Sequence, residues 1–115
     1  MSIEALWTVN FAAPSGAGNG IVVFESGKLY GGDAQYYWTG TYTVNNGKII
    51  ATLDVRNYGG MPYSVFGQLK NFQLEIDANV PGTIAPGTVM QASGRLVNQP
   101  AQGMTLYLTY RAALP

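Results

Sequence analysis

The 115-residue chain contains neither cysteine nor histidine. The absence of cysteine excludes a disulfide framework and a thiol nucleophile. The absence of histidine removes the side chain that most often serves as general base or metal ligand near neutral pH. Charge is scarce as well, because only 10% of residues are charged and the six basic side chains cancel the six acidic ones. A chain without a basic surface has no electrostatic means of attracting nucleic acid or an anionic membrane.

Long apolar runs are also missing. No stretch approaches the ~18 consecutive apolar residues that a membrane-spanning helix requires. The segment MSIEALWTVNF at the start does not have the basic region and apolar run of a secretory signal. We therefore expect a cytoplasmic protein. We also expect a single domain over residues 1–115, because this length suffices for one modest core.

What the chain does have is a regular alternation of apolar and polar residues. In 49–56, Ile49, Ala51, Leu53 and Val55 share one face of an extended strand. Similar patterns cover 7–11, 35–44, 72–78, 88–96 and 105–111, and shorter ones cover 20–25 and 28–31. Aromatic and β-branched residues, which suit strands, fill these segments, and helix signals are nearly missing. The pattern predicts about eight strands.

Turn residues separate the predicted strands. Asn46-Gly47 and Ser26-Gly27 each lie between two alternating segments, which indicates tight antiparallel hairpins. Longer connections are expected at 59–62, 80–87 and 98–103. An antiparallel chain of this kind must protect its edge strands, and closure into a barrel removes the edges. We predict an all-β fold, an eight-stranded antiparallel up-and-down barrel of the lipocalin or calycin type, with a two-sheet sandwich as the alternative.

The sequence offers little material for catalysis. The glycine-rich segment GAGNG (16–20) lacks the following helix and the G-K-[ST] of a phosphate-binding loop, so we expect a flexible hairpin loop at the barrel mouth. Asp54, Glu75 and Asp77 fall on the polar faces of their strands, which would be the outside of a barrel. Without a close acid pair, a histidine or a cysteine, we predict no enzyme activity, no metal site and no cofactor.

Aromatic residues are the strongest candidates for binding. Trp7, Tyr36, Trp38 and Tyr42 fall on the predicted inward faces. Such rings commonly fill a core, and an eight-stranded barrel is narrow enough for side chains to fill it. The alternative is a pocket for a small apolar ligand, with phenol hydroxyls that set the orientation of the ligand. We favour the packed core and keep the pocket as the second interpretation.

Other tyrosines fall on outer faces or in loops, namely Tyr37, Tyr58, Tyr63 and Tyr107. Exposed tyrosines on a surface with little charge are typical of protein–protein interfaces. Tyrosine also suits strands at half-buried positions, which would give these residues a purely structural role. A net charge of zero opposes association between copies only weakly, so the chain is a candidate homodimer.

The segment YGGDAQYYWTGTY (30–42) combines an acid with a run of aromatic residues. Gly31-Gly32 supplies permissive backbone for a turn, and Asp33 is suited to accept hydrogen bonds within that turn. The aromatic residues then alternate inward, with Gly40 on the same face at a bend or close approach. We interpret the segment as a turn followed by a core strand, and not as an acid beside a stacking platform.

The same segment and its neighbours resemble the GrlR-like family, small bacterial proteins related to negative regulators of type III secretion genes. The shared order is ALWTVNF, GNGIVVFESGKLYGGD, YWTG, a hairpin, a strand ending in RNY, and a Pro-Tyr-Ser-Val link before NFQLEI. The resemblance covers roughly residues 5–78. Its most specific piece is GGD followed by an aromatic-x-Gly strand.

The resemblance implies a dimeric, lipocalin-like barrel without catalytic activity that binds another protein, in the characterised case a transcriptional activator. In that regulator a short acidic run after the GGD strand contributes to partner recognition. The corresponding positions 44–48 read VNNGK here, without an acid. We assign a partner surface to Tyr37, Asn45, Asn46 and Lys48 and expect a protein partner of the transcriptional-regulator class. The alternative function is a barrel that binds a small apolar ligand through Trp7, Tyr36, Trp38 and Tyr42.

Overall fold

The computed structural model describes residues 2–14, 16–60, 64, 66–67 and 69–115. The strands are β1 (Ala5–Ala13), β2 (Gly16–Glu25), β3 (Lys28–Gly32), β4 (Tyr36–Asn45), β5 (Lys48–Asn57), β6 (Asn71–Asn79), β7 (Val89–Leu96) and β8 (Gly103–Ala113). The described part of the chain contains no helix of the length and apolarity needed to cross a membrane.

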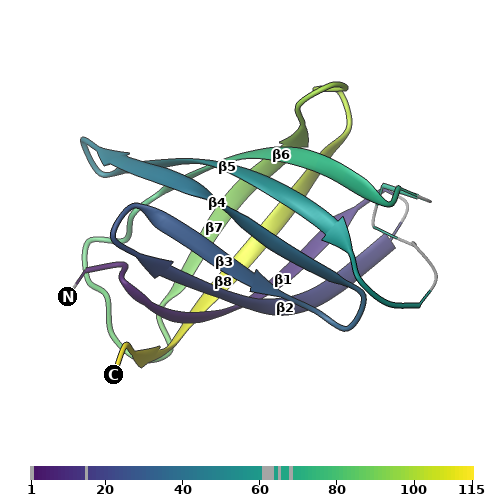
Figure 1. Cartoon of the computed structure of the whole chain (residues 1–115). Helices are drawn as coiled ribbons and strands as arrows, with labels where there is room; N and C mark the ends of the chain where they lie inside the picture. Colours follow the sequence, from purple (N-terminus) through teal and green to yellow (C-terminus); the bar gives the residue numbers. More distant parts are fainter. Residues whose placement is uncertain (1, 15, 61–63, 65, 68) are drawn as a thin grey trace.

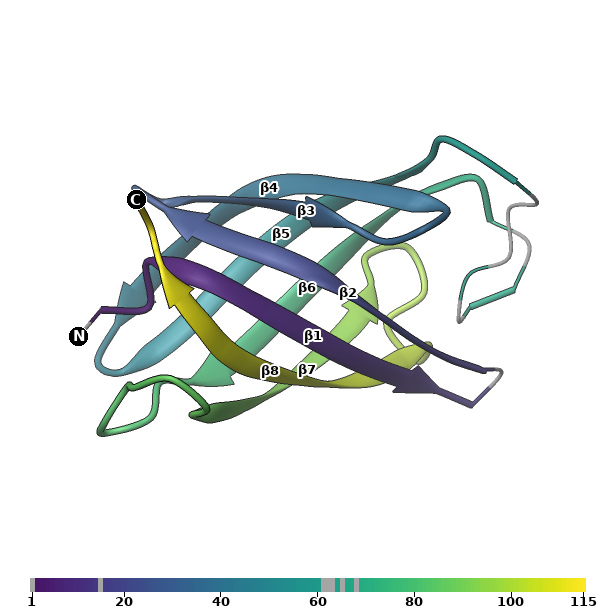
Figure 2. The same cartoon turned by 90° about the horizontal axis from the view of Figure 1, so that it is seen from below.

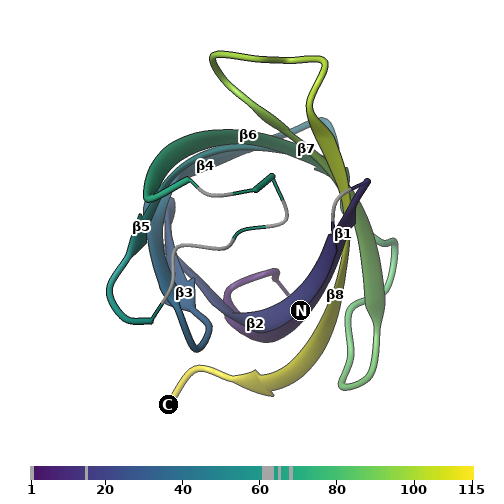
Figure 3. The same ribbon diagram turned by 90° about the vertical axis from the view of Figure 1, so that its right-hand side faces the viewer.

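Each strand pairs antiparallel with the next along the chain, and β1 pairs with β8 to close the sheet. Figures 1 and 2 show the strands winding around a common axis, and Figure 3 shows the ring that they form. The predicted eight-stranded up-and-down barrel is therefore confirmed. The sandwich alternative is wrong, because the pairing of β1 with β8 leaves neither strand as a free edge.

The two predicted hairpin turns are present. Ser26 and Gly27, between β2 and β3, have φ values of 52° and 80°. Asn46 and Gly47, between β4 and β5, have φ values of 53° and 73°. Two consecutive residues in the left-handed region give the turn whose twist matches that of the flanking strands, and both sequence pairs tolerate this conformation.

Inward-facing residues form the core. On β5 the predicted alternation is confirmed, since Ile49, Ala51, Leu53 and Val55 are all buried. Val44 would continue the inward face of the alternating segment 35–44, but half of its surface is exposed, at 50%. The reason is its position, because β3 pairs with β4 only as far as Thr41 and Val44 extends past that pairing.

One end of the barrel is closed by aromatic packing. Trp7 and Tyr110 are among the most buried large side chains, and their rings meet edge to face at 5.4 Å. The indole Nε1 of Trp7 donates a hydrogen bond of 2.9 Å to the carbonyl of Ile3. Ile3 precedes β1 and Ile84 lies between β6 and β7, and both are buried in the same core. Trp7 is therefore a structural residue of the closed end.

The segment 16–20 is not a loop, contrary to the expectation from its glycines. It forms the first half of β2 and pairs with β1 in unbroken register, from Ala13 with Gly16 to Val9 with Gly20. A Cβ atom at position 18 would lie 2.7 Å from Cε2 of Phe11, which is too close for two carbon atoms. These glycines therefore make room for an aromatic ring inside a strand, and the prediction of a flexible loop is wrong.

Candidate functional site

Beyond the contact between Trp7 and Tyr110, the barrel encloses a cavity of about 330 Å³. All eight strands contribute lining residues, which rules out a simple surface groove. The filled interior that the sequence favoured is therefore wrong for this half of the barrel. The physical reason is side-chain volume, since the inward positions 51, 78 and 92 are alanines that face the cavity. Three small side chains at these positions leave space that leucine or isoleucine would fill.

Trp38, on β4, forms part of the cavity wall. A Cβ atom at Gly20 would lie 2.8 Å from Cη2 of this indole, and one at Gly31 would lie 2.9 Å from its Nε1. The indole therefore lies directly against the bare backbone of β2 and β3. The ring of Phe11 meets it edge to face at 6.3 Å. The glycines thus allow two large aromatic rings to line the cavity without filling it.

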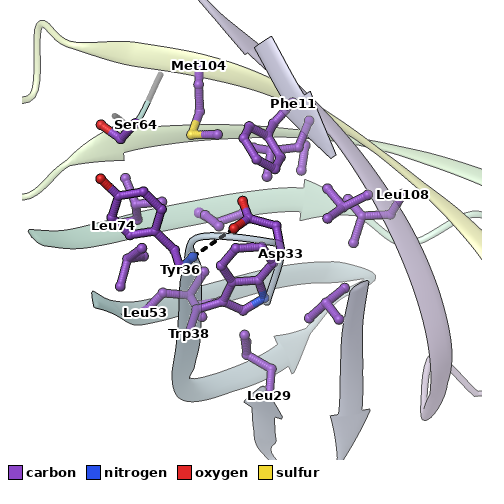
Figure 4. Close-up of a pocket in the computed structure, with 18 of the residues that line it drawn as sticks. Phe11, Leu29, Asp33, Tyr36, Trp38, Leu53, Ser64, Leu74, Met104 and Leu108 are labelled. Atoms are coloured by element: carbon purple, nitrogen blue, oxygen red, sulfur yellow. Dashed lines mark hydrogen bonds between the residues drawn. The ribbon is translucent and has the colours of Figure 1, made fainter. Parts of the chain in front are cut away.

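Tyr36, the first residue of β4, lines the cavity (Figure 4). Its hydroxyl donates a hydrogen bond of 2.6 Å to the carbonyl of Leu69, and its ring packs on Phe72 at 5.9 Å. Burial raises the pKa of the Tyr36 phenol, and the negative charge of Asp33 raises it further. The phenol is therefore a neutral group that ties β4 to the segment before β6.

Asp33 lies in the turn between β3 and β4, as predicted. Its Oδ1 accepts hydrogen bonds of 2.8 Å from the backbone N–H groups of Gln35 and Tyr36, and its own N–H donates to the carbonyl of Tyr36 at 2.9 Å. The hydroxyl of Tyr58 donates to the Asp33 carbonyl. The Asx-type turn is therefore confirmed. The structure adds that this half-buried carboxylate also lines the cavity.

Polar groups are confined to one end of the cavity. Besides Tyr36, the polar lining side chains are Asp33, Gln35 and Ser64, and all three belong to the connections that follow β3 and β5. Figure 3 looks into this end, where the described part of the connection between β5 and β6 lies over the ring. The arrangement is an apolar chamber with a polar rim, which is the usual form of a small-molecule binding site.

The structure brings together only two of the four residues predicted to line a pocket. Tyr36 and Trp38 line the cavity, whereas Trp7 and Tyr42 do not. The half-buried ring of Tyr42 packs edge to face on Phe24 at 5.2 Å. Met104 also lines the cavity, from β8, although the sequence did not single it out. Extending the alternation of Leu106 and Leu108 by one step toward the N-terminus would have found it.

The predicted partner surface is divided between two ends of the barrel. Tyr37 is the second residue of β4, whereas Asn45, Asn46 and Lys48 surround the hairpin at its far end. Eight residues along a strand correspond to about 27 Å, so these side chains do not form one contiguous surface. The ammonium of Lys48 lies 3.8 Å from Asp77. Tyr63, predicted to be exposed, lies outside the described residues.

Tyr37 belongs instead to an exposed apolar patch, which we call the outer patch: Ile21 on β2, Tyr30 on β3, Tyr37 on β4 and Tyr58 just after β5. Ile21 and Tyr37 pair with Gly32 from opposite sides, and Gly32 carries no side chain to separate them. Tyr30 is the diagonal neighbour of both, and the ring of Tyr58 lies 6.2 Å from that of Tyr37. Tyr107, also confirmed as exposed, lies on β8.

The remaining acidic residues of the predicted strands lie on the outer face. Arg95 pairs with Glu75 at 3.2 Å and with Asp77 at 3.1 Å, and Asp54 accepts a hydrogen bond of 2.8 Å from Gln73. Among the residues that the structure describes, no three acidic side chains come together as metal ligands would. Comparison of the chain with protein-family models and with curated proteins finds no match, so the site is interpreted from its own geometry.

Proposed function

We propose that this chain is a non-enzymatic, cytoplasmic barrel that binds one small apolar molecule in its interior. The observation that carries the proposal is the cavity of about 330 Å³, with apolar walls and a polar rim. Its volume lies at the lower end of the range for small-molecule sites. At about 30 Å³ for each water-sized group, it accommodates a ligand of about eleven non-hydrogen atoms.

The chemistry of the rim supports binding without a reaction. Among the residues that the structure describes, Asp33 is the only acidic side chain that lines the cavity, and its Oδ1 is already engaged by two backbone N–H groups. The chain has no histidine or cysteine that could act together with it as base or nucleophile. The phenol of Tyr36 is hydrogen-bonded to Leu69 and has a raised pKa, which makes it a weak proton donor.

Calorimetric titration with 1-octanol tests the proposal. We expect saturable binding of one molecule to the unaltered chain. Ala92→Leu should abolish this binding while the barrel stays folded, because the larger side chain occupies the cavity. Gln91→Leu is the matched control, since the adjacent side chain points outward and leaves the cavity unchanged. The proposal fails if octanol does not bind, or if Ala92→Leu binds it as well as the unaltered chain does.

The outer patch favours a second candidate function, contact with another protein. Ile21, Tyr30, Tyr37 and Tyr58 are each more than 40% exposed on a chain with no net charge. We propose that this patch supports homodimerisation or the binding of a protein partner such as a transcriptional regulator, as the resemblance to GrlR-like proteins implies. Such a patch is of the kind that marks an interface.

Sedimentation equilibrium tests the homodimer. We expect the average mass to rise toward twice that of the chain with increasing concentration. The double substitution Tyr37→Lys with Tyr58→Lys should abolish the rise, because it adds positive charge to both copies of the contact. Tyr107→Lys on β8 is the control and should leave the association unchanged. A mass that stays at that of one chain at every concentration would exclude the homodimer.

A further inference from the structure

The charge of the cavity rim bears on the chemical class of the ligand. All six basic residues of the chain are among the described residues, and none of them lines the cavity. Arg56 lies near the end of β5 at the rim and Lys70 directly precedes β6, but both are exposed to solvent. The single charged lining residue is Asp33. A carboxylate or phosphate head group would therefore meet a negative charge at the rim and no positive one.

The two carboxylate oxygens of Asp33 have different roles. Oδ1 accepts the N–H groups of Gln35 and Tyr36, which fixes the carboxylate in place. Figure 4 shows the other oxygen turned away from the bond to Tyr36. Burial is the main cause that raises the pKa of the Tyr36 phenol, and the negative charge of Asp33 is the second. The carboxylate is thus held in place through Oδ1, and its negative charge acts on groups at the rim such as the Tyr36 phenol.

Aromatic rings accompany this carboxylate. Tyr36 and Trp38 line the same cavity as Asp33, from the strand that follows its turn (Figure 4). Phe11 adds a third ring, 6.3 Å from the indole of Trp38. The faces of aromatic rings attract cations, and rings combined with a carboxylate form the usual environment for an organic ammonium group. The hydroxyl of Tyr36 donates a hydrogen bond to the carbonyl of Leu69, so toward a ligand its oxygen is an acceptor.

We propose that the cavity selects an apolar amine, with the ammonium group at Asp33, Tyr36 and Trp38 and the apolar part inside the barrel. This inference rests on the proposed function, because it assigns a ligand class to the same cavity. The rim offers the ammonium group acceptors and ring faces, and the alanines at 51, 78 and 92 provide the space for the apolar part. Fatty acids, the anionic counterparts of such amines, are disfavoured by the same carboxylate.

Titration with three probes of equal chain length tests the ligand class: octylammonium, 1-octanol and octanoate at neutral pH. We expect octylammonium to bind roughly five- to tenfold more tightly than octanol, which is the range for a cation held by ring faces and a carboxylate. Octanoate should bind most weakly. Asp33→Asn should reduce the preference for octylammonium over octanol, measured as the ratio of the two affinities within the same variant. Asparagine keeps an oxygen that accepts the turn hydrogen bonds.

The outcomes separate the two proposals. If octanol binds and octylammonium binds no more tightly, the amine selectivity is wrong while the apolar site stands. The same conclusion follows if Asp33→Asn keeps the full preference for octylammonium. If none of the three probes binds, both proposals are contradicted. Binding of octanoate equal to that of octylammonium would likewise exclude a role for the Asp33 charge.

Discussion

The indole of Trp38 occupies the space that a side chain at position 20 would need. A Cβ atom on Gly20 would lie 2.8 Å from Cη2 of Trp38, although the two residues belong to β4 and β2. The same indole blocks position 31, where a Cβ atom would also meet the carbonyl oxygen of Ile21 at 1.8 Å. The cavity wall thus depends on residues without side chains on two neighbouring strands.

Alanine substitution of these glycines should destabilise the barrel. We expect Gly31→Ala to lower the free energy of unfolding by about 3 kcal/mol, because the clash is with backbone that cannot move independently. Gly82→Ala, in the connection between β6 and β7, meets no atom within 4 Å and should change stability little. Urea denaturation of the two variants measures the difference. Equal stability of both variants would show that the indole and strands do not pack as described.

The turn at Asp33 should be sensitive to loss of its carboxylate. Asp33→Ala leaves the N–H groups of Gln35 and Tyr36 without their acceptor, which should cost about 1–3 kcal/mol of stability. Asp33→Asn should cost less, since the amide oxygen accepts the same bonds. Asp54→Ala on the outer surface is the control and should change stability by about 0.5 kcal/mol or less. Thermal denaturation distinguishes the three, and equal losses in Asp33→Ala and Asp54→Ala would contradict the role of the turn.

Alkaline pH should destabilise the protein through the phenols of Tyr36 and Tyr42. Burial is the largest cause that raises the pKa of Tyr36 and of Tyr42 above the usual 10.0. The unfolded chain therefore loses these protons first, so the stabilising contribution is complete below pH ~10 and is lost as pH rises through the folded-state values. We expect the stability of the unaltered chain to fall more steeply above pH ~10 than that of the double variant Tyr36→Phe with Tyr42→Phe. Identical slopes in urea denaturation would show that the phenols are not perturbed.

The two tryptophans should respond differently to a ligand. Trp38 lines the cavity, whereas Trp7 is fully buried at the closed end. In Trp7→Phe, where Trp38 is the remaining tryptophan, 1-octanol should shift the emission to shorter wavelength by displacing water from the indole. In Trp38→Phe the emission of Trp7 should not change. A response carried by Trp7 would place the ligand outside the cavity described here.

The fold was predictable because its signals are local. Alternation along β5 identifies the buried face without reference to other strands, and Asn46-Gly47 specifies its hairpin by backbone conformation alone. The cavity was not predictable in this way. Alternation predicts that Ala51, Ala78 and Ala92 face inward. It does not predict whether the inward side chains of all eight strands together fill the barrel interior.

The glycines of β2 illustrate the same limit. Glycine is usually a sign of a turn or loop, and 16–20 was therefore expected to be one. Their actual role depends on Phe11 and Trp38, which reach them from other strands. Contacts of this kind become visible only when the strand order and register are known. Alternation along β4 correctly predicts that Tyr36 and Trp38 face inward. It does not predict that Trp7, on another strand, lies outside the cavity lining.

Methyl-resolved NMR with 1-octanol gives the position of the ligand in solution. The methyl groups of Leu29 and Met104 line the cavity, whereas Leu6 is outside the cavity lining and precedes Trp7 on β1. We expect saturable shifts and nuclear Overhauser contacts from octanol to Leu29 and Met104, with Leu6 unaffected. No contacts to Leu29 and Met104, or contacts only to outward-facing methyl groups such as that of Leu6, would show that the barrel interior is not a binding site.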